Sequence, residues 1–409
     1  MRNLLWIGSL SYLLIGLAHV VMGAVLEELL QYFQRDYSDG GLLIFAQFSG
    51  FLIGVLTTPW WSKQLGRRGM ILLAFGALTL GQSVYSFLPS WEWMIVTAPL
   101  AGFGFGMVEA AIGALVIGFV HKNKAVAMSR LEVFFGIGAC VMPVLGSVLI
   151  MMGLWKISFP ILAAMSLGML ILWSFISFGS MDAVLTKQDS SEEKGAASGT
   201  DIQGEEAPSL NGRRGLPLLF IMVVFFFLYV GIEMSLVHFL PSILIEHSGT
   251  SSALGTLGVS FFWIAMVIGR LFAGHLSEKW GYGRYLLMNG FGSLLVMAII
   301  PLITGLAASY SLILLLGLLM AGLFAIGLIF TNQILPGTAE RTTSLLIAAG
   351  GLGGALLPLL TGKVMDQYKS VISMWTLIGL MALMMAMLVI VIRLSDSVLV
   401  VDRKVNVEK

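Results

Sequence analysis

Long apolar runs, separated by short polar turns, follow one another along almost the whole chain. A helix needs about 20 apolar residues to cross the hydrocarbon core of a bilayer, and twelve runs are close to that length. Their ranges are 4–26, 42–62, 70–88, 93–119, 127–151, 157–179, 216–241, 253–276, 285–305, 310–332, 343–365 and 372–393. Membrane strands alternate polar and apolar residues, whereas these runs are continuously apolar. The pattern therefore predicts an all-α membrane protein with twelve transmembrane helices.

One long polar stretch, from Ser180 to Arg214, separates the sixth run from the seventh. It is rich in serine, glycine and charged residues, a composition that cannot bury enough apolar surface to fold. We predict a flexible cytoplasmic linker there, flanked by two six-helix bundles and followed by a cytoplasmic tail. The predicted segments are the first bundle at 1–179, the linker at 180–215, the second bundle at 216–394 and the tail at 395–409. Two related bundles of this kind are typical of secondary transporters.

The basic residues predict the orientation of the helices. The first run begins at Leu4 and is longer than the core of a signal peptide, so it is predicted to be a transmembrane helix that stays in the protein. If both termini are cytoplasmic, 19 of the 23 lysines and arginines lie on the cytoplasmic side, and the four others are Arg35, Lys156, Lys363 and Lys369. The positive-inside rule favours this orientation, in the plasma (inner) membrane of the cell.

Composition supports a membrane protein and excludes several other classes. Hydrophobic residues make up 58% of the chain and charged residues only 11%, against about a quarter charged in soluble domains. The net charge of +1 and the lack of a basic block argue against a nucleic-acid partner. Cys140 is the sole cysteine, which excludes an intrachain disulfide or a thiolate metal site. No cofactor is predicted, because the glycines at 350–354 lack the strand and loop of a phosphate site.

Two cytoplasmic turns resemble each other and carry basic residues. The turn between the second and third runs lies within 54–69, and the turn between the eighth and ninth lies within 269–284; both place a glycine at a similar distance before basic residues. An internal repeat predicts such a match, although any tight turn can carry glycine and arginine. We expect the basic residues near these turns to gate the cytoplasmic side; they are Lys63, Arg67, Arg68, Arg130, Arg270 and Lys279.

Three carboxylates lie inside apolar runs: Glu109, Glu132 and Glu233. An ionised carboxylate at a helix centre costs about 2.5–3.5 kcal/mol on insertion scales, so these positions suggest function. Burial disfavours the charged form of a carboxylate, which allows it to gain and lose a proton. Glu109 is flanked by Gly102, Gly106 and Gly113 on one helical face. These glycines serve either close helix packing or a cavity wall into which Glu109 projects.

The other polar residues of the runs are candidates for the same cavity. Glu132 follows Arg130 closely and forms either a gate salt bridge or a substrate contact, and Glu233 forms a substrate contact or a structural hydrogen bond. Amides and carboxylates bind sugar hydroxyls, and aromatic faces cover the ring. The candidates for substrate binding are Glu109, Gln47, Glu132, Glu233, Trp263 and Asn332, with His19 as a further polar group. A lone membrane histidine or amide can equally bond a neighbouring helix.

Several segments together resemble the fucose–galactose–glucose proton symporter family of the major facilitator superfamily, in particular its bacillary glucose/mannose proton symporters. The segments are Leu43 to Phe51, Gly104 to Gly113, Met128 to Gly136, Gly231 to Glu233 with Phe239 to Leu244, and Val259 to Trp263 with Gly269 and Arg270. They are spread over both halves, so the resemblance extends over nearly the whole chain outside the linker. The resemblance implies the major facilitator fold and proton-coupled sugar transport.

The resemblance also assigns roles to single residues. Glu109 matches the glutamate of the fourth helix that this family associates with sugar binding and proton coupling. The fucose branch has an aspartate in its first helix that is implicated in protonation; the matching position here is Gly23, with His19 one turn earlier. The resemblance implies that Glu109 couples the proton, alone or with His19. The coupling ion stays open, because sodium-coupled sugar carriers belong to the same broad group.

The sequence thus predicts a carrier, not an enzyme, that moves a glucose- or mannose-type hexose with a proton by alternating access. The carrier is expected to be monomeric, and the choice among hexoses is left open. One alternative is a proton-driven exporter of drugs or metabolites, because Gly138, Pro143 and Gly146 partly match an antiporter signature. An alternative from another class is a membrane sugar sensor that does not transport, for which the linker and tail are short.

Overall fold

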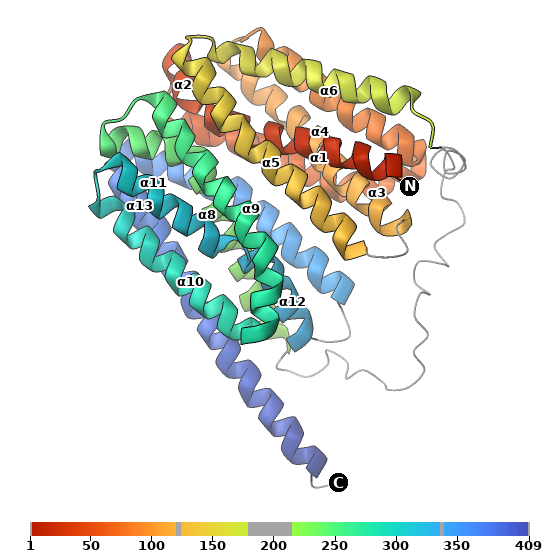
Figure 1. The fold of residues 1–409 in the computed structure, drawn as a ribbon, viewed down its shortest axis with the longest axis vertical. Helices are drawn as coiled ribbons and strands as arrows, with labels where there is room; N and C mark the ends of the chain where they lie inside the picture. Colours follow the sequence, from red (N-terminus) through yellow and green to blue (C-terminus); the bar gives the residue numbers. More distant parts are fainter. Residues whose placement is uncertain (1, 120–123, 179–214, 336–338, 408–409) are drawn as a thin grey trace.

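The computed structural model describes residues 2–119, 124–178, 215–335 and 339–407, which contain helices and no strand. The first half of the chain contains α1 (Arg2–Ala24), α2 (Leu26–Phe33), α3 (Tyr37–Ser86), α4 (Trp91–Phe119), α5 (Lys124–Met151) and α6 (Ser158–Phe175). The second half contains α8 (Gly215–Ser248), α9 (Ser252–Trp280), α10 (Tyr282–Ile299), α11 (Leu306–Met320), α12 (Leu323–Ile334) and α13 (Ala339–Val407). Figure 1 shows the two halves side by side, the first in red to yellow and the second in green to blue.

Ten helices in the described part of the chain are long and apolar enough to cross a membrane. The prediction of an all-α, multi-pass membrane protein is therefore confirmed. The predicted runs 42–62 and 70–88 both lie in α3, and the runs 343–365 and 372–393 both lie in α13. α11 and α12 together cover the predicted run 310–332. The predicted linker lies outside the described residues except at Gly215, and α13 continues as a helix through most of the predicted tail.

α3 and α13 are each kinked at one residue with a non-helical backbone. Gly66 in α3 has φ 70° and ψ 166°, and Lys369 in α13 has φ 71° and ψ 167°. Gly153 and Gly281 also have positive φ, 70° and 85°. The intervals within the halves are nearly equal, 153 − 66 = 87 and 369 − 281 = 88 residues. The same pair of turns thus recurs in both halves, as inverted repeats within each half predict, and lysine replaces glycine in one of the four.

Helix packing joins each half and then joins the halves along a surface that we call the seam. In the first half α3 packs against α4 and α6, and α1 against α5; in the second, α8 packs against α13 and α9 against α11. The seam consists of the contacts of α3 with α13, α5 with α9 and α1 with α8. A Cβ atom on Gly23 would lie 2.7 Å from the Cα atom of His238. α1 and α8 therefore approach backbone to backbone at the seam.

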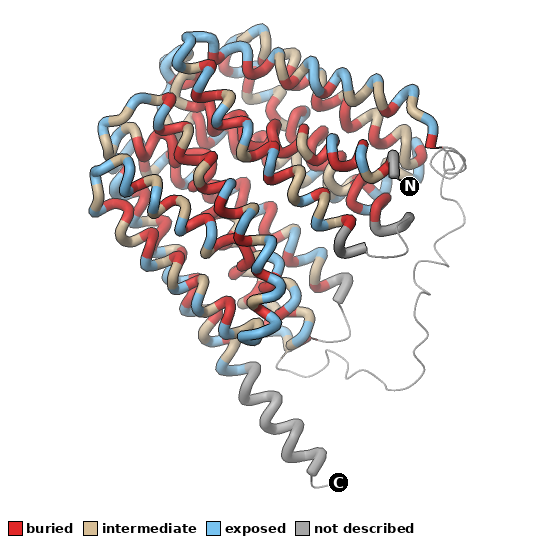
Figure 2. The backbone as a smooth tube through the Cα atoms, in the orientation of Figure 1, coloured by how far each residue is buried: buried red, intermediate tan, exposed pale blue. Residues whose placement is uncertain are grey.

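The burial pattern is that of a helical bundle with a lipid-facing surface. In the most apolar stretch of α1, 78% of the residues are buried, against 28% in α6, so α1 lies inside the bundle and α6 at its edge. Figure 2 shows the buried residues on the inner sides of the helices. Large apolar side chains cover the outside, with Phe175 84% and Leu216 72% exposed. An extensive exposed apolar surface of this kind suits contact with lipid.

Candidate functional site

Arg270 of α9 contacts two carboxylates, one in each half of the chain. Its guanidinium lies 3.6 Å from Glu132 Oε2 on α5 and 3.9 Å from Glu233 Oε1 on α8. It also lies 5.7 Å from the ring centroid of Trp263, within cation–π range. Glu233 is nearly buried, with 7% of its side chain exposed, whereas Arg270 and Glu132 are 30% and 46% exposed. The predicted gating residue Arg270 and the predicted substrate residues Glu132, Glu233 and Trp263 thus form one cluster.

Glu109 lies on α4 beside this cluster. It is close enough to interact electrostatically with Glu132 and Arg270, and its backbone carbonyl accepts a 2.9 Å hydrogen bond from the hydroxyl of Tyr12 on α1. Three carboxylates therefore gather around one guanidinium. We call Glu109, Glu132, Glu233 and Arg270 the charged cluster.

The glycines near Glu109 serve helix packing. A Cβ atom on Gly102 would lie 1.8 Å from the carbonyl oxygen of Gln47, and one on Gly106 would lie 2.5 Å from the carbonyl oxygen of Phe51. Both carbonyls belong to α3, so these two glycines let α3 and α4 pack backbone against backbone. The packing alternative explains Gly102 and Gly106 and leaves the charge of the half-buried Glu109, within an apolar helix, without a structural reason.

His19 of α1 is buried among aromatic rings. Its ring centroid lies 5.1 Å from that of Phe48, 5.6 Å from Phe105 and 5.4 Å from Phe135. Its Nε2 lies 3.1 Å from the sulfur of Met234 on α8. Across the seam the centroid of the His238 ring lies 6.5 Å away. The predicted polar candidate of α1 therefore faces the second half directly.

The other predicted binding residues differ in their surroundings. Gln47 is fully buried, and neither of its amide atoms has a hydrogen-bond partner in the described part of the chain. The same holds for Nε1 of Trp263, whose ring lies 5.8 Å from that of Phe135. Asn332 instead donates a 2.8 Å hydrogen bond to the Thr343 hydroxyl and links α12 to α13. Its Oδ1 atom is buried without a described partner.

Two of the predicted gating residues make contacts within the first half. Arg68 donates hydrogen bonds to the carbonyls of Trp173, Ser174 and Ile176, at 3.0, 2.8 and 2.7 Å, and so caps the C-terminal end of α6. Arg130 lies 4.0 Å above the ring of Trp6 and thereby ties α5 to α1. These contacts hold helices of the first half together.

The remaining predicted gating residues lie at helix turns. Lys63 is exposed and Arg67 half-buried, on either side of the kink at Gly66. Lys279 is exposed in the last turn of α9, directly before the turn at Gly281. The two turns that the sequence identified as related therefore share a positive-φ glycine next to basic residues.

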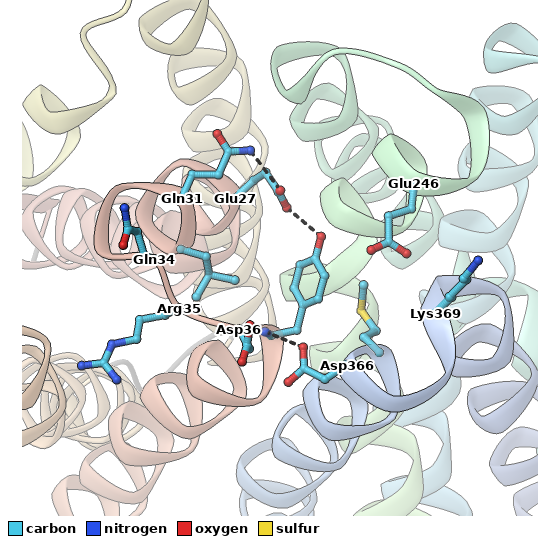
Figure 3. A pocket seen from close by; sticks show the side chains of 11 residues that line it. Glu27, Gln31, Gln34, Arg35, Asp36, Glu246, Asp366 and Lys369 are labelled. Atoms are coloured by element: carbon cyan, nitrogen blue, oxygen red, sulfur yellow. Dashed lines mark hydrogen bonds between the residues drawn. The ribbon is translucent and has the colours of Figure 1, made fainter.

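Polar contacts close the end of the seam opposite to these turns. Asp366 of α13 accepts hydrogen bonds from the backbone N–H groups of Tyr37 and Ser38, at 2.8 and 2.6 Å. Ser252 donates to Glu28, and both contacts join the two halves. Next to them is a pocket of about 560 Å³, lined by Glu27, Leu30, Gln31, Gln34, Arg35, Asp36, Tyr37, Glu246, Met365, Asp366 and Lys369. Figure 3 shows Glu27 and Arg35 of the first half on one side of it and Glu246 and Lys369 of the second half on the other. In the described residues no cluster of histidine, cysteine and carboxylate side chains suits a metal ion.

Two residues of the seam, His238 and Asp366, are not among the candidates that the sequence predicts. His238 is an ionisable side chain inside an apolar run, and such a residue is a functional candidate by its position alone. That criterion selected His19 and the three glutamates but applies equally to His238. Asp366 lies between two predicted runs, where an aspartate is unremarkable. Its contact with Tyr37 joins residues 329 positions apart in sequence, which only the packing of the halves brings together.

Residues 8–358 match the Major Facilitator Superfamily. The chain is also similar to the glucose/mannose transporter GlcP of Bacillus subtilis, with 31% identity over 378 residues that cover 91% of each protein. Among solved structures, a bacterial homolog of the human lysosomal transporter Spinster, in an inward-facing and occupied conformation, superimposes with a TM-score of 0.76 at 13% identity, over 96% of this chain and 97% of that one. A D-xylose-proton symporter superimposes with a TM-score of 0.76 at 14% identity, over 94% and 96% of the chains. These two likenesses concern the fold alone.

Proposed function

The chain belongs to the major facilitator superfamily, a family of transporters and not of enzymes, and from that premise we propose that it carries a hexose of the glucose or mannose type across the membrane together with a proton. The similarity to a glucose/mannose transporter over 91% of both proteins supports the choice of substrate class. The observation that carries the proposal is the charged cluster, in which Arg270 of the second half pairs with Glu132 of the first.

The charge balance of the cluster favours proton coupling. With Glu109, Glu132 and Glu233 ionised, three negative charges surround the single positive charge of Arg270, which leaves a net charge of −2 (−3 + 1). Like charges held together oppose further ionisation. Binding of one proton therefore removes part of the repulsion, and Glu109, which has no ion pair among the described contacts, is the proposed carrier of that proton.

Alternating access links the proton to the sugar. The halves are proposed to rock about the seam, so the Arg270–Glu132 contact across it forms and breaks in each cycle. Protonated Glu109 allows the hexose to bind from outside, and loss of the proton inside resets the carrier. The membrane potential adds about 2.3 kcal/mol per charge per 100 mV to this cycle.

The proposed topology has twelve transmembrane helices. α3 is 50 residues long, which at about 1.5 Å per residue would exceed the roughly 30 Å hydrocarbon core more than twofold. α3 and α13 are therefore proposed to cross twice each and to turn at Gly66 and Lys369, while α11 and α12 together cross once. Both termini then lie on one side, which the distribution of basic residues makes cytoplasmic. The two six-helix bundles would comprise residues 1–179 and 216–394.

The structure is proposed to be the inward-facing form of the carrier. In the proposed topology the contacts of Asp366 with Tyr37 and of Ser252 with Glu28 close the extracellular end. Toward the cytoplasm, 46% of the Glu132 side chain and 30% of Arg270 are exposed although both lie within membrane helices. The charged cluster is thus in contact with solvent from the cytoplasmic side.

The alternatives are less well supported. A Cβ atom on Gly138, part of the exporter signature, would lie 2.1 Å from the carbonyl oxygen of Leu13, so close packing of α1 and α5 accounts for this glycine.

Uptake of a panel of labelled hexoses into liposomes, with and without an inward proton gradient, tests the proposal. We expect one hexose to accumulate only with the gradient. If folded protein takes up no hexose, the assignment of a sugar substrate is wrong, and the exporter and the sugar sensor are the alternatives that stay.

A further inference from the structure

His238 and His19 face each other where α1 of the first half packs against α8 of the second. His238 on α8 is completely buried and His19 on α1 is 6% exposed. Their ring centroids are 6.5 Å apart and the rings are tilted by 32°. One turn along α1, Gly23 leaves no space for a side chain against the backbone of His238. The two imidazoles therefore lie directly in the contact of α1 with α8.

Most nitrogens of this pair have no hydrogen bond. In the described part of the chain, three ring nitrogens have no hydrogen-bond partner: Nδ1 and Nε2 of His238 and Nδ1 of His19. The remaining nitrogen, Nε2 of His19, contacts the sulfur of Met234, a weak acceptor. Buried polar atoms without partners are rare and destabilising. Packing alone would be served better by apolar side chains of similar size, so these two histidines call for a functional explanation.

The surroundings of the pair have the chemistry of a sugar site. Phe48 lies 5.1 Å from the ring of His19 and 5.7 Å from the ring of His238, measured between centroids. Phe135 contacts both His19 and Trp263, and Trp263 has its own unpartnered Nε1. Polar atoms that can donate or accept stand next to aromatic faces that can cover the C–H side of a ring. Trp263 also contacts Arg270, so Phe135 and Trp263 connect the histidine pair to the charged cluster.

We propose that His238 and His19 are the two sides of a hydroxyl-binding site for the transported hexose, one contributed by each half. This inference rests on the proposed function and assigns His19 to the sugar, with the proton left to Glu109. When α1 and α8 separate on the extracellular side, the unpartnered nitrogens face the opening and bind hydroxyl groups of the entering sugar. When the hexose leaves toward the cytoplasm, the rings pack together again, as they do in this structure.

Exchange of labelled hexose across liposomes at equal concentrations on both sides tests this site. Such exchange needs sugar binding but no proton gradient. We expect His238→Phe to raise the half-saturating hexose concentration about fivefold to tenfold, the loss of one or two hydrogen bonds. His238→Gln, which keeps a donor and an acceptor, should restore most of the affinity and also shows that the position tolerates substitution. His275→Phe, at an exposed position of α9, is the matched control and should behave as the wild type.

Deoxyhexoses distinguish a binding role from a structural one. The analogue that lacks the hydroxyl bound by His238 should bind the wild type more weakly than the parent hexose does, yet bind His238→Phe as well as the parent does. Two results would overturn the site while the proposed function stands. One is that His238→Phe loses the same affinity for the parent hexose and for every analogue; the other is that its half-saturating hexose concentration equals that of the wild type. A wild-type protein that exchanges no hexose at all would instead contradict the proposed function and the site with it.

Discussion

The carboxylate of Asp366 caps the helix that begins at Tyr37, although the two residues belong to opposite halves of the chain. Oδ1 of Asp366 accepts a 2.8 Å hydrogen bond from the backbone N–H of Tyr37, the dashed line at Asp366 in Figure 3. Oδ2 accepts one of 2.6 Å from the backbone N–H of Ser38. The first N–H groups of a helix have no partner within the helix. A negative charge there also interacts favourably with the helix dipole. A helix of the first half is thus capped only while the second half lies against it.

Loss of this cap should open the extracellular end. Removal of an N-terminal cap costs about 1 kcal/mol, so Asp366→Ala should raise the ratio of open to closed molecules roughly fivefold. Spin labels at Tyr32→Cys and Thr250→Cys, in a Cys140→Ala background, report the separation of the halves by double electron–electron resonance. We expect a larger population at the longer distance.

Asp39→Ala provides the control for that measurement. Asp39 lies in the same first turn of α3 as Tyr37, but its carboxylate pairs with Arg35 of the same half, at 3.8 Å. Its loss should leave the distance distribution unchanged. Equal distributions for Asp366→Ala and the wild type would show that the cap does not stabilise the closed end.

Lys369 is the one residue other than glycine among the four repeated turns. Its φ of 71° and ψ of 167° lie in a region that is almost restricted to glycine, and such a conformation costs about 1–3 kcal/mol. Lys369→Gly should therefore raise the melting temperature of the protein in detergent. Tyr368→Gly, one position earlier, should lower it because glycine destabilises a helix. A lower melting temperature for Lys369→Gly would mean that the lysine side chain stabilises the turn by more than the strain.

Closure of the extracellular end should depend on pH through Glu28. Burial raises the pKa of the Glu28 carboxyl above its ordinary value of 4.5, and the hydrogen bond from Ser252 offsets part of that shift. A raised pKa means that the closed form favours the protonated acid. Closure is therefore most stable at low pH and weakens as the pH rises above 4.5 through the raised pKa. The spin-label distances should show more open molecules at higher pH.

Glu28→Gln isolates this dependence from that of the other carboxylates nearby. The variant keeps a group that Ser252 can bond and removes the titration, so its open population should vary less with pH than that of the wild type. Identical pH profiles for the two proteins would exclude Glu28 as the titrating group.

Arg270 should stabilise the fold by offsetting the negative charges of Glu132 and Glu233. Arg270→Gln leaves Glu233 and Glu132 without a positive partner, so the melting temperature should fall. The loss should be a fraction of the roughly 3–5 kcal/mol of a fully buried pair, because Arg270 is 30% exposed. Arg270→Gln with Glu233→Gln should recover much of that loss, since both charges of one pair are then absent.

Arg35→Gln is the comparison for this pair. Arg35 binds Glu92 at 3.0 Å, but 70% of the Glu92 side chain is exposed, and an exposed pair contributes about 0–1 kcal/mol. Its melting temperature should stay near that of the wild type. A double variant no more stable than Arg270→Gln would contradict the charge-balance account.

The sequence was sufficient to predict membrane-spanning helices, because a continuous apolar run of that length can cross a bilayer only as a helix. Charges inside apolar runs also singled out Glu109, Glu132 and Glu233, which the structure brings together around Arg270. The partner of Glu132 was not predictable, since Arg270 lies 138 positions later (270 − 132) on a helix of the other half. Arg68 illustrates the same limit: its motif predicts a gating role, but its hydrogen bonds to the carbonyls at the end of α6 could not be predicted from the sequence.

The glycines and histidines show a second limit. Gly102 and Gly106 fit both helix packing and a cavity wall. The structure decides for packing, because a Cβ atom on either would lie only 1.8 Å or 2.5 Å from an α3 carbonyl oxygen. His19 and His238 were equally visible as ionisable residues in apolar runs. Their importance comes from facing each other across the seam, which depends on how two distant helices pack.

The most direct test of the account measures protons and sugar together. Purified protein in weakly buffered liposomes is given the transported hexose without any imposed gradient, and the external pH is recorded. The account predicts that the medium becomes more alkaline with the wild type, because protons enter with the sugar. With Glu109→Gln that change should vanish while equilibrium exchange of the hexose continues. Hexose uptake by the wild type without a pH change, or an unchanged signal in Glu109→Gln, would contradict proton coupling at Glu109.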